Sequence, residues 1–353
     1  MTAVRLTFNP AMPECRDALS AVVQIGDTLW LANDETTHLE RLTRQGEDAE
    51  GNPLYAAHTR FVLQDYLQLP VAADADDNEV DLEGLAYADG YLWMVGSHSL
   101  KRKKPKFPDA NDQSIQRLGR ITWDANRYLL ARISLTSVDG VLTLQTPASQ
   151  LPIHRKGNAL TDALREDPHL GEFFAIPGKD NGFDIEGLAV AGKRIFLGLR
   201  GPVLRGWAVI LEVAVRPDAD DPSTLQLLKI GENKRPYRKH FLQLGGLGVR
   251  DLCVQGDDLL ILAGPTMSLD GPVNIYRWQG GALVEGESVV AAEHLPLVLA
   301  VPYGGGDDHA EGITLWQQPD GTEGMLLVYD SAATGRKRGE NSVLADLYNA
   351  PAS

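Results

Sequence analysis

One short pattern occurs twice in nearly the same form, and it limits the folds that this chain can adopt. Residues 81–99 are DLEGLAYADGYLWMVGSHS, and residues 184–202 are DIEGLAVAGKRIFLGLRGP. In each stretch a short apolar segment is followed by a tight turn with glycine and by a second apolar segment. Glycine and aspartate tolerate the positive φ of two-residue turns, so this pattern predicts a β-hairpin.

Three further windows align with these two when the turns are superimposed. They begin at Ser20, at Arg250 and at Glu311, and the last of them has a longer turn. Consecutive copies are spaced by roughly 60 residues, except that about 40 more lie between Glu83 and Glu186. The chain therefore repeats one hairpin unit five times.

More apolar strands follow several of the hairpins, which gives about four strands per repeat. The stretches RYLLARISL and GVLTLQT follow the second hairpin, WAVILEVAV and TLQLLKI the third, and PVNIYRWQG and ALVEGESVV the fourth. About four strands per repeat is typical of a β-propeller blade. We predict an all-β fold, a single five-bladed propeller over residues 1–353, with blades that start near residues 17, 81, 184, 248 and 309. A solenoid of the same repeats is an alternative fold.

The long spacing predicts an insertion within residues 98–183, which includes a short surface helix in GNALTDALREDPHLGEFF. A sixth blade inside this insertion is the main alternative. The last repeat ends one strand short at SVLADLYNA, and the N-terminal AVRLTFN has no partner of its own. We predict that this N-terminal strand becomes the outer strand of the last blade and removes an exposed edge.

Composition and charge narrow the functional classes. The chain is 43% hydrophobic and 23% charged, as in a globular protein, with no apolar stretch long enough to span a bilayer and no secretory signal pattern at its start. Its two cysteines match no zinc or disulfide pattern, so we expect a cytoplasmic location. The net charge of −15 argues against nucleic-acid or anionic-membrane binding as the main task.

The residue that opens each hairpin has the chemistry of a polar site. The five aligned positions hold one serine, three glutamates and one arginine: Ser20, Glu83, Glu186, Arg250 and Glu311. Carboxylates around one axis raise each other's pKa unless a cation balances them. That cation could be a divalent metal or Arg250, and ordinary polar lining is a third interpretation. Asp81 and Asp184 point the same way as their glutamates in a strand and could support the ligands or cap the turn.

Basic residues gather in loops that the propeller would place at the same end as the glutamates. The groups are Lys101, Arg102, Lys103, Lys104 and Lys106; Arg200 and Arg205; Lys234, Arg235, Arg238 and Lys239, in a stretch expected to link the third and fourth blades; and Arg336, Lys337 and Arg338. Arginine and lysine neutralise phosphate oxygens, so these loops predict an anion site. The alternatives are charged loops that serve solubility, or a surface for a protein or nucleic acid.

The stretch GLRGPV at residues 198–203, after Asp184-x-Glu186-Gly187, resembles a bacterial domain family of unknown function marked by that motif. The repeated Glu-Gly-Leu hairpin is also similar to those of the calcium-dependent apyrases and the phytase-like esterase propellers. The apyrase resemblance implies a Ca²⁺ site in the central channel, with one residue from each of five blades. Here the ligands from four blades would be Ser20, Glu83, Glu186 and Glu311. In the fourth blade the turn alignment places Arg250 at the ligand position, so Asp251 could bind the ion only if its strand is shifted or bulged by one residue.

These observations predict a metal-dependent hydrolase of a phosphorylated or other anionic small molecule. Arg200 and His98 are the candidate catalytic residues, while the anion would be bound by Arg200, Arg250, Lys101, Arg102, Arg235 and Arg238. The alternative is a non-catalytic propeller that binds a protein partner or an anionic ligand through the same face, with no metal. No phosphate-binding loop, dinucleotide motif or nucleophile elbow is visible. The acidic stretches at 74–79 and 218–221 lack the pattern of an EF-hand and are interpreted as turns.

Overall fold

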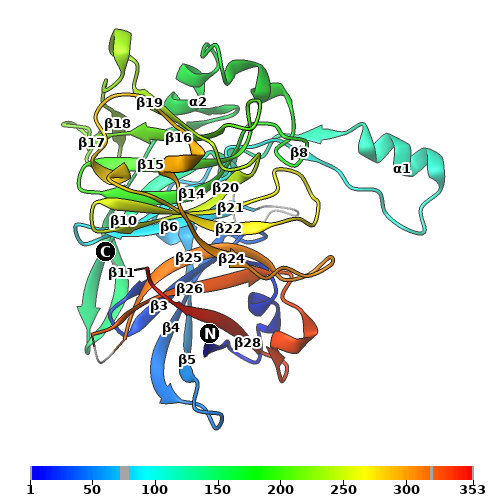
Figure 1. Cartoon of the computed structure of the whole chain (residues 1–353), viewed down its shortest axis with the longest axis vertical. Coiled ribbons are helices and arrows are strands. Elements are labelled where there is room, and N and C mark those ends of the chain that lie inside the picture. Colours follow the sequence, from blue (N-terminus) through cyan, green and yellow to red (C-terminus); the bar gives the residue numbers. More distant parts are fainter. Residues whose placement is uncertain (1, 72–78, 319–320, 352–353) are drawn as a thin grey trace.

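The computed structural model describes residues 2–71, 79–318 and 321–351, and these are built mainly from antiparallel strands (Figure 1). Most of the acidic stretch 74–79 lies outside the described residues. Four groups of four strands follow the chain order. The first sheet contains β2 (Leu19–Ile25), β3 (Thr28–Asn33), β4 (His38–Glu47) and β5 (Pro53–Val62), and the second contains β6 (Leu82–Ala88), β7 (Tyr91–Gly96), β10 (Leu130–Val138) and β11 (Val141–Gln150). The third sheet contains β14 (Asp184–Ala191), β15 (Arg194–Gly201), β16 (Ala208–Val213) and β19 (Tyr237–Leu242), and the fourth contains β20 (Gly248–Gln255), β21 (Asp258–Gly264), β22 (Val273–Trp278) and β24 (Leu297–Val301).

The N-terminal strand completes the last sheet, as predicted. This sheet contains β25 (His309–Gln317), β26 (Glu323–Asp330) and β28 (Ser342–Asn349), and β1 (Thr2–Thr7) pairs antiparallel with β28 along its whole length. The short strand β27 (Lys337–Arg338) pairs with the other side of β28. Because β1 also pairs in parallel with β5 for two residues, one continuous sheet joins the two ends of the chain. An edge strand that would otherwise be open is thereby covered.

The first strands of the sheets form a closed ring. β2, β6, β14 and β20 each contact the next strand of this series, β20 contacts β25, and β25 contacts β2 again. The apolar core lies between neighbouring sheets. Trp30 and Met94 share a cluster between the first two sheets, and Phe196 and Ile261 share one between the third and fourth. Sheets arranged around a ring with apolar layers between them are the architecture of a β-propeller.

Two outer strands differ from the prediction. TLQLLKI supplies only β18 (Leu225–Leu227), which pairs with β17 (Val215–Pro217) in a separate ribbon, and β19 takes the outer place in the third sheet. ALVEGESVV supplies β23 (Ser288–Val290), which adds in parallel to β19, while β24 is the outer strand of the fourth sheet. The apolar pattern identified strands correctly, but it contains no information on which strand each one pairs with.

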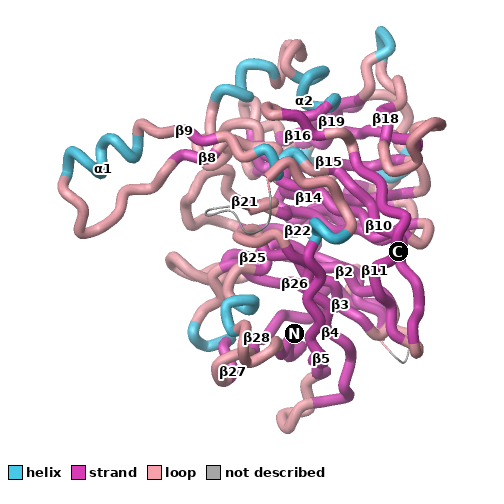
Figure 2. Tube along the Cα trace, turned by 180° about the vertical axis from the view of Figure 1, so that it is seen from behind, coloured by secondary structure: helices cyan, strands magenta, loops and turns pink. Residues whose placement is uncertain are grey.

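The predicted insertion is divided into two parts, because β10 and β11 inside it belong to the second sheet. The first part is an arm with β8 (Lys101–Arg102), α1 (Asn111–Leu118) and β9 (Ile121–Thr122), and it projects from the body of the molecule (Figures 1 and 2). The second part holds β12 (Ile153–His154), β13 (Gly157–Asn158) and α2 (Ala159–Leu164), the expected short helix.

Among the residues that the structure describes, no helix is long and apolar enough to cross a bilayer.

Candidate functional site

A β-bulge occurs at the same place in every inner strand. The pairing register shifts around one residue in each hairpin, and the five residues are Ser20, Glu83, Glu186, Arg250 and Glu311. A bulge leaves its extra residue outside the regular ladder and changes the direction of its side chain. These are the five positions that the turn alignment matched, so the sequence repeat records a repeated bulge. We call the end of the ring that carries them the channel mouth.

The glycine that follows each glutamate is required by the close approach of the inner strands. A Cβ atom on Gly84 would lie 2.6 Å from the Cβ of Leu188 on the neighbouring inner strand, and one on Gly187 would lie 3.0 Å from Leu252. A Cβ on Gly312 would lie 3.0 Å from the backbone of Ala21. The Glu-Gly pair therefore combines a polar residue at the bulge with space for the next strand.

The residue two places after each bulge is apolar. These five buried side chains line the floor of a cavity of about 480 Å³, which opens at the hairpin-turn end of the inner strands; they are Val22, Leu85, Leu188, Leu252 and Ile313. The polar channel mouth and this cavity thus lie on opposite sides of one apolar layer. A ligand at the channel mouth would contact polar side chains, whereas a ligand in the cavity would contact an apolar floor.

Two arginines hold Glu186 and Glu311. Nη1 of Arg250 lies 2.9 Å from Glu186 and 2.9 Å from Glu311, and Nη1 of Arg200 donates to Glu186 at 2.6 Å. Burial would raise the pKa of Glu186, but the two guanidinium groups hold it below its usual range. This part of the mouth has the geometry of the ion network that was considered as one alternative to a metal.

A second group of carboxylates includes one, Glu83, that has no such arginine partner among the described residues. One oxygen each from Asp34, Asp81 and Glu83 lies within 4.8 Å of the others. Glu83 is only 9% exposed, and in the described part of the chain no hydrogen bond or ion pair reaches its carboxylate. Burial and the nearby charges of Asp81 and Glu186 raise the pKa of Glu83, and burial together with Asp81 raises the pKa of Asp34 to about 8.

The partners of this carboxylate group come from three segments. Asp34 follows β3, and Asp81 stands immediately before β6 with a positive φ of 54°. Asp81 shares Nη2 of Arg127 with Glu79, at 3.0 Å and 2.6 Å. Sequence analysis named Asp81 as a supporting residue but missed Asp34 and Arg127, because neither belongs to the repeated hairpin motif.

Lys179 is a further residue that the sequence did not indicate. It lies in the loop before β14 with an exposed side chain. Partial desolvation opposes its charge, but the negative charges of Glu311, Glu83 and Asp34 raise its pKa overall. An exposed ammonium group is therefore available at the acidic side of the mouth. The only sequence signal for it is its position, five residues before Asp184.

Two other predicted ligands connect neighbouring inner strands. The hydroxyl of Ser20 on β2 donates to the carbonyl of Leu82 on β6 at 2.6 Å. The carboxylate of Asp251 on β20 accepts hydrogen bonds from the backbone N–H of Leu252, at 2.7 Å, and of Ile313 on β25, at 2.8 Å. Asp251 occupies the place that glycine has in three of the other hairpins and alanine, Ala21, in the first. The structure thus engages both side chains in strand-to-strand contacts.

His98 is buried rather than exposed to the mouth. Its Nδ1 donates to the carbonyl of Gly96 at 2.8 Å, and its Nε2 accepts from the side-chain amide of Asn158, also at 2.8 Å. Burial lowers the pKa of His98 to about 4. Asn158 also caps α2, so this neutral imidazole joins the second sheet to the second part of the insertion. We assign it no chemistry.

Several basic groups of the mouth loops have acidic partners. Lys101 lies 2.7 Å from Glu79, and Arg102 lies 2.7 Å from Asp180. Arg336 contacts both Asp308 and Asp346 at 2.8 Å. Because these pairs neutralise one another, the mouth loops are less positive than the sequence suggested.

Arg235 and Arg238 lie at the other end of the third sheet, contrary to the prediction for this stretch. Arg238 is part of β19, whose first residue Tyr237 pairs with Val213, close to the hairpin turn of β14 and β15. The channel mouth is at the opposite end of these strands. Arg238 contacts Glu212 and Arg235 contacts Glu287. The prediction failed because it treated the outer strand of a blade as the linker between blades.

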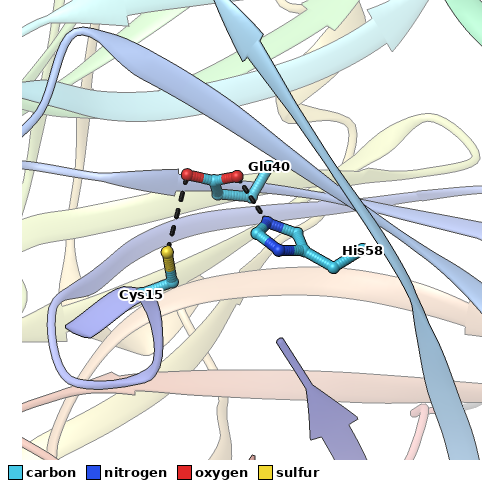
Figure 3. A group of neighbouring side chains, drawn as sticks. All are labelled: Cys15, Glu40 and His58. Atoms are coloured by element: carbon cyan, nitrogen blue, oxygen red, sulfur yellow. Dashed lines mark hydrogen bonds and ion pairs between the residues drawn. The ribbon is translucent and has the colours of Figure 1, made fainter. Parts of the chain in front are cut away.

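A third polar cluster lies in the first sheet, away from the inner strands. Figure 3 shows Cys15, Glu40 and His58 converging, with His58 2.5 Å from Glu40. Arg60 donates to the sulfur of Cys15 at 2.8 Å and lies 2.7 Å from Glu40. Burial and the charge of Glu40 raise the pKa of the Cys15 thiol to about 12. With Arg60 already the cation of this cluster, we assign it a structural role.

Three of the solved structures that align with this chain are remote likenesses. The Myxococcus xanthus glutaminyl cyclase aligns at 11% identity and a TM-score of 0.39, over 99% of this chain and 100% of that one. The Bacteroides ovatus xyloglucan PUL GH43B aligns at 10% and 0.43, over 97% of this chain and 53% of that one. The phage phi92 endosialidase aligns at 10% and 0.40, over 99% and 69%. No curated protein matches the chain.

One family model covers most of the sequence. The family of proteins of unknown function DUF3616 matches residues 18–346, which include all five hairpins. This finding agrees with the prediction of a domain family of unknown function, while the likeness to calcium-dependent apyrases and phytase-like esterases stays a prediction. The chain therefore belongs to the DUF3616 family.

Proposed function

We propose that this chain is a five-bladed propeller that binds one divalent cation at its channel mouth through Asp34, Asp81 and Glu83. One observation carries the proposal: three carboxylate oxygens lie within 4.8 Å of one another, and one of them belongs to the buried and unbonded Glu83. Buried like charges at such distances raise each other's pKa unless a cation balances them. A bound cation would supply that balance.

The ligand atoms favour a hard cation. Carboxylate oxygens suit Ca²⁺ or Mg²⁺, and Ca²⁺ takes about six to eight oxygens in flexible geometry. Three side chains would leave places for water, a backbone carbonyl or an oxygen of a bound molecule. We assign Glu186 and Glu311 a different task, because both hold Arg250. They would fix a guanidinium next to the ion instead of binding it.

The cation would take an anionic small molecule together with Lys179. The exposed ammonium of Lys179 lies near the same carboxylates, so one anionic oxygen could contact the ion and another could contact Lys179. A divalent cation polarises phosphoryl oxygens and lowers the pKa of a bound water. Hydrolysis of a phosphate ester or phosphoanhydride is therefore the activity that this site would support best.

The first experiment measures metal binding. Protein purified without chelator is analysed for metal content, and its thermal midpoint is recorded with EDTA and with Ca²⁺ or Mg²⁺. A ligand that binds only the folded state raises the midpoint. We expect one equivalent of metal and a rise in midpoint in the wild type, both lost in Glu83→Gln. The matched control is Glu166→Gln, which changes an exposed glutamate outside the repeated hairpins and should behave as the wild type.

The second experiment separates catalysis from binding. A panel of phosphate esters and anhydrides is tested for turnover with the metal that binds. Turnover that disappears in Glu83→Gln supports the hydrolase. Metal binding without turnover on any member would favour the alternative, a non-catalytic propeller that binds an anion or a protein. That alternative has its own support, because Arg200 and Arg250, which were expected to bind the anion of a substrate, are already paired with carboxylates.

A further inference from the structure

The arm, residues 101–123, makes almost no contact with the apolar core. It contains β8, α1 and β9, and no residue of α1 is buried. None of its residues belongs to a hydrophobic cluster of the described chain. Its large apolar side chains face solvent: Phe107 is 90% exposed, Ile115 68%, Trp123 52% and Leu118 44%. The two views show the arm extending beyond the sheets (Figures 1 and 2).

An arm of this composition is not stable in water by itself. Isolated helices shorter than about 12 residues are marginal, and a two-stranded ribbon needs a packed face to be stable. α1 has eight residues, and β8 and β9 have two residues each. The contacts inside the arm are polar, such as those of Arg117 with the carbonyl of Lys104 and of Arg102 with that of Leu118. An apolar partner surface would stabilise the arm in this form.

The charge of the arm is opposite to that of the chain. The arm holds seven lysines and arginines against two aspartates, while the whole chain has a net charge of −15. Lys101 and Arg102 at its base form ion pairs with Glu79 and Asp180. The basic groups farther out form no ion pair with the described residues; they are Lys103, Lys104, Lys106, Arg117 and Arg120. The partner surface should therefore be both apolar and acidic.

The chain itself presents such a surface. Residues 283–297, which we call the blade edge, run along the outside of the third and fourth sheets through β23 and the start of β24. Their exposed apolar side chains are Leu283 (59%), Val289 (70%) and Leu297 (55%). The same segment contains three exposed glutamates and no lysine or arginine. Glu287 pairs with Arg235, while Glu285 and Glu293 form no ion pair with a lysine or arginine of the described residues.

We propose that the arm of one copy of this chain docks on the blade edge of a second copy. Phe107, Ile115 and Leu118 would cover the exposed apolar residues of the blade edge, and the lysines of the arm would face its glutamates. Opposite charge gives such a contact its specificity and association rate, while apolar burial gives it most of its affinity. The proposal concerns the arm beyond its base at the channel mouth and does not depend on the proposed metal site.

The test uses the full chain and three variants at exposed positions. The arm variant is Lys103→Glu/Lys104→Glu/Lys106→Glu, the edge variant is Glu285→Lys/Glu293→Lys, and the apolar variant is Phe107→Ser/Ile115→Ser. Sedimentation velocity over a dilution series measures their mass. We expect the wild type to self-associate in low salt. The dissociation constant of each variant should be higher than that of the wild type by about tenfold or more. Circular dichroism verifies that each variant keeps its fold.

Mixing the two charge variants gives the decisive result. Alone, each places like charges against like charges, but in a mixture the acidic arm of one meets the basic edge of the other. We expect the mixture to associate although neither variant does so alone. A wild type that stays monomeric in low salt at about 100 μM, where weak assemblies are populated, would overturn the proposal. So would a mixture in which the variants remain separate, because the partner of the arm would then be another molecule.

Discussion

Protonation of His98 should weaken the fold between neutral and mildly acidic pH. The imidazole is 1% exposed, and both nitrogens form hydrogen bonds that suit the neutral ring. Burial lowers its pKa to about 4 from 6.5, so between these values the unfolded chain binds a proton that the folded chain does not. The stabilisation that His98 contributes is therefore fully present above its pKa in the unfolded chain, 6.5, and is lost as the pH falls toward its pKa in the folded chain, about 4.

The size of the effect follows from the two pKa values. Each unit of pKa difference corresponds to about 1.4 kcal/mol, so the full loss is about 3 kcal/mol, and about 2 kcal/mol of it occurs between pH 7 and pH 5. Other buried groups titrate in this range as well, including Asp34 and Asp184. A comparison with a variant that lacks only the imidazole removes their contribution.

His98→Asn is the suitable variant, because the backbone at residue 98 has a φ of 55° and asparagine tolerates this region. Urea unfolding at a series of pH values gives the free energy of unfolding of both proteins. At neutral pH the variant should be less stable, since it loses packing and one hydrogen bond. The difference should shrink by about 2 kcal/mol on going from pH 7 to pH 5. If the two curves stay parallel, His98 is not a buried neutral group and this reasoning is wrong.

Two further predictions concern the inner strands and the third sheet. Gly84→Ala should lower the free energy of unfolding by about 2 kcal/mol or more in urea titrations, because its Cβ would lie 2.6 Å from that of Leu188, while Gly335→Ala, with open space around it, should change little. Glu212 is buried, which opposes its charge, but contacts with His240, Arg194 and Arg238 lower its pKa to about 2. Its stabilisation is therefore present above the unfolded pKa of the carboxyl and is lost as pH falls toward 2, by about 3 kcal/mol at most. Acid unfolding of Glu212→Gln should lack this part of the pH dependence, and equal slopes for both proteins would contradict the assigned contacts.

Local patterns made much of the fold predictable. Alternating apolar residues and glycine turns located the five hairpins, since both signals depend only on neighbours in the chain. The unpaired strand at each end of the chain predicted the pairing of β1 with β28. Outer strands were less predictable, because β18 and β23 have good strand patterns but pair outside the expected places.

In the candidate site, too, some residues could be predicted from the sequence and others could not. Glu83, Glu186 and Glu311 were predictable as one group because a repeated bulge leaves a repeated motif. Asp34 and Lys179 were not predictable, because each lies in a loop without a motif and approaches Glu83 only in the closed ring. Arg250 could be named as a possible counter-ion from its place in the repeat, yet only its distances show that it binds Glu186 and Glu311.

The sequence by itself determined the repeating unit: a hairpin that opens with a polar residue and has an apolar residue two places later, with glycine or alanine between them in four of the five copies. That order satisfies local requirements of turn, bulge and close strand packing, which every copy meets separately. The tertiary structure alone decided which charges meet. Ring closure brings residues from different sheets within a few ångströms. At that range burial and Coulomb energy select which carboxylates are paired with arginine and which, like Glu83, form no ion pair within the described part of the chain.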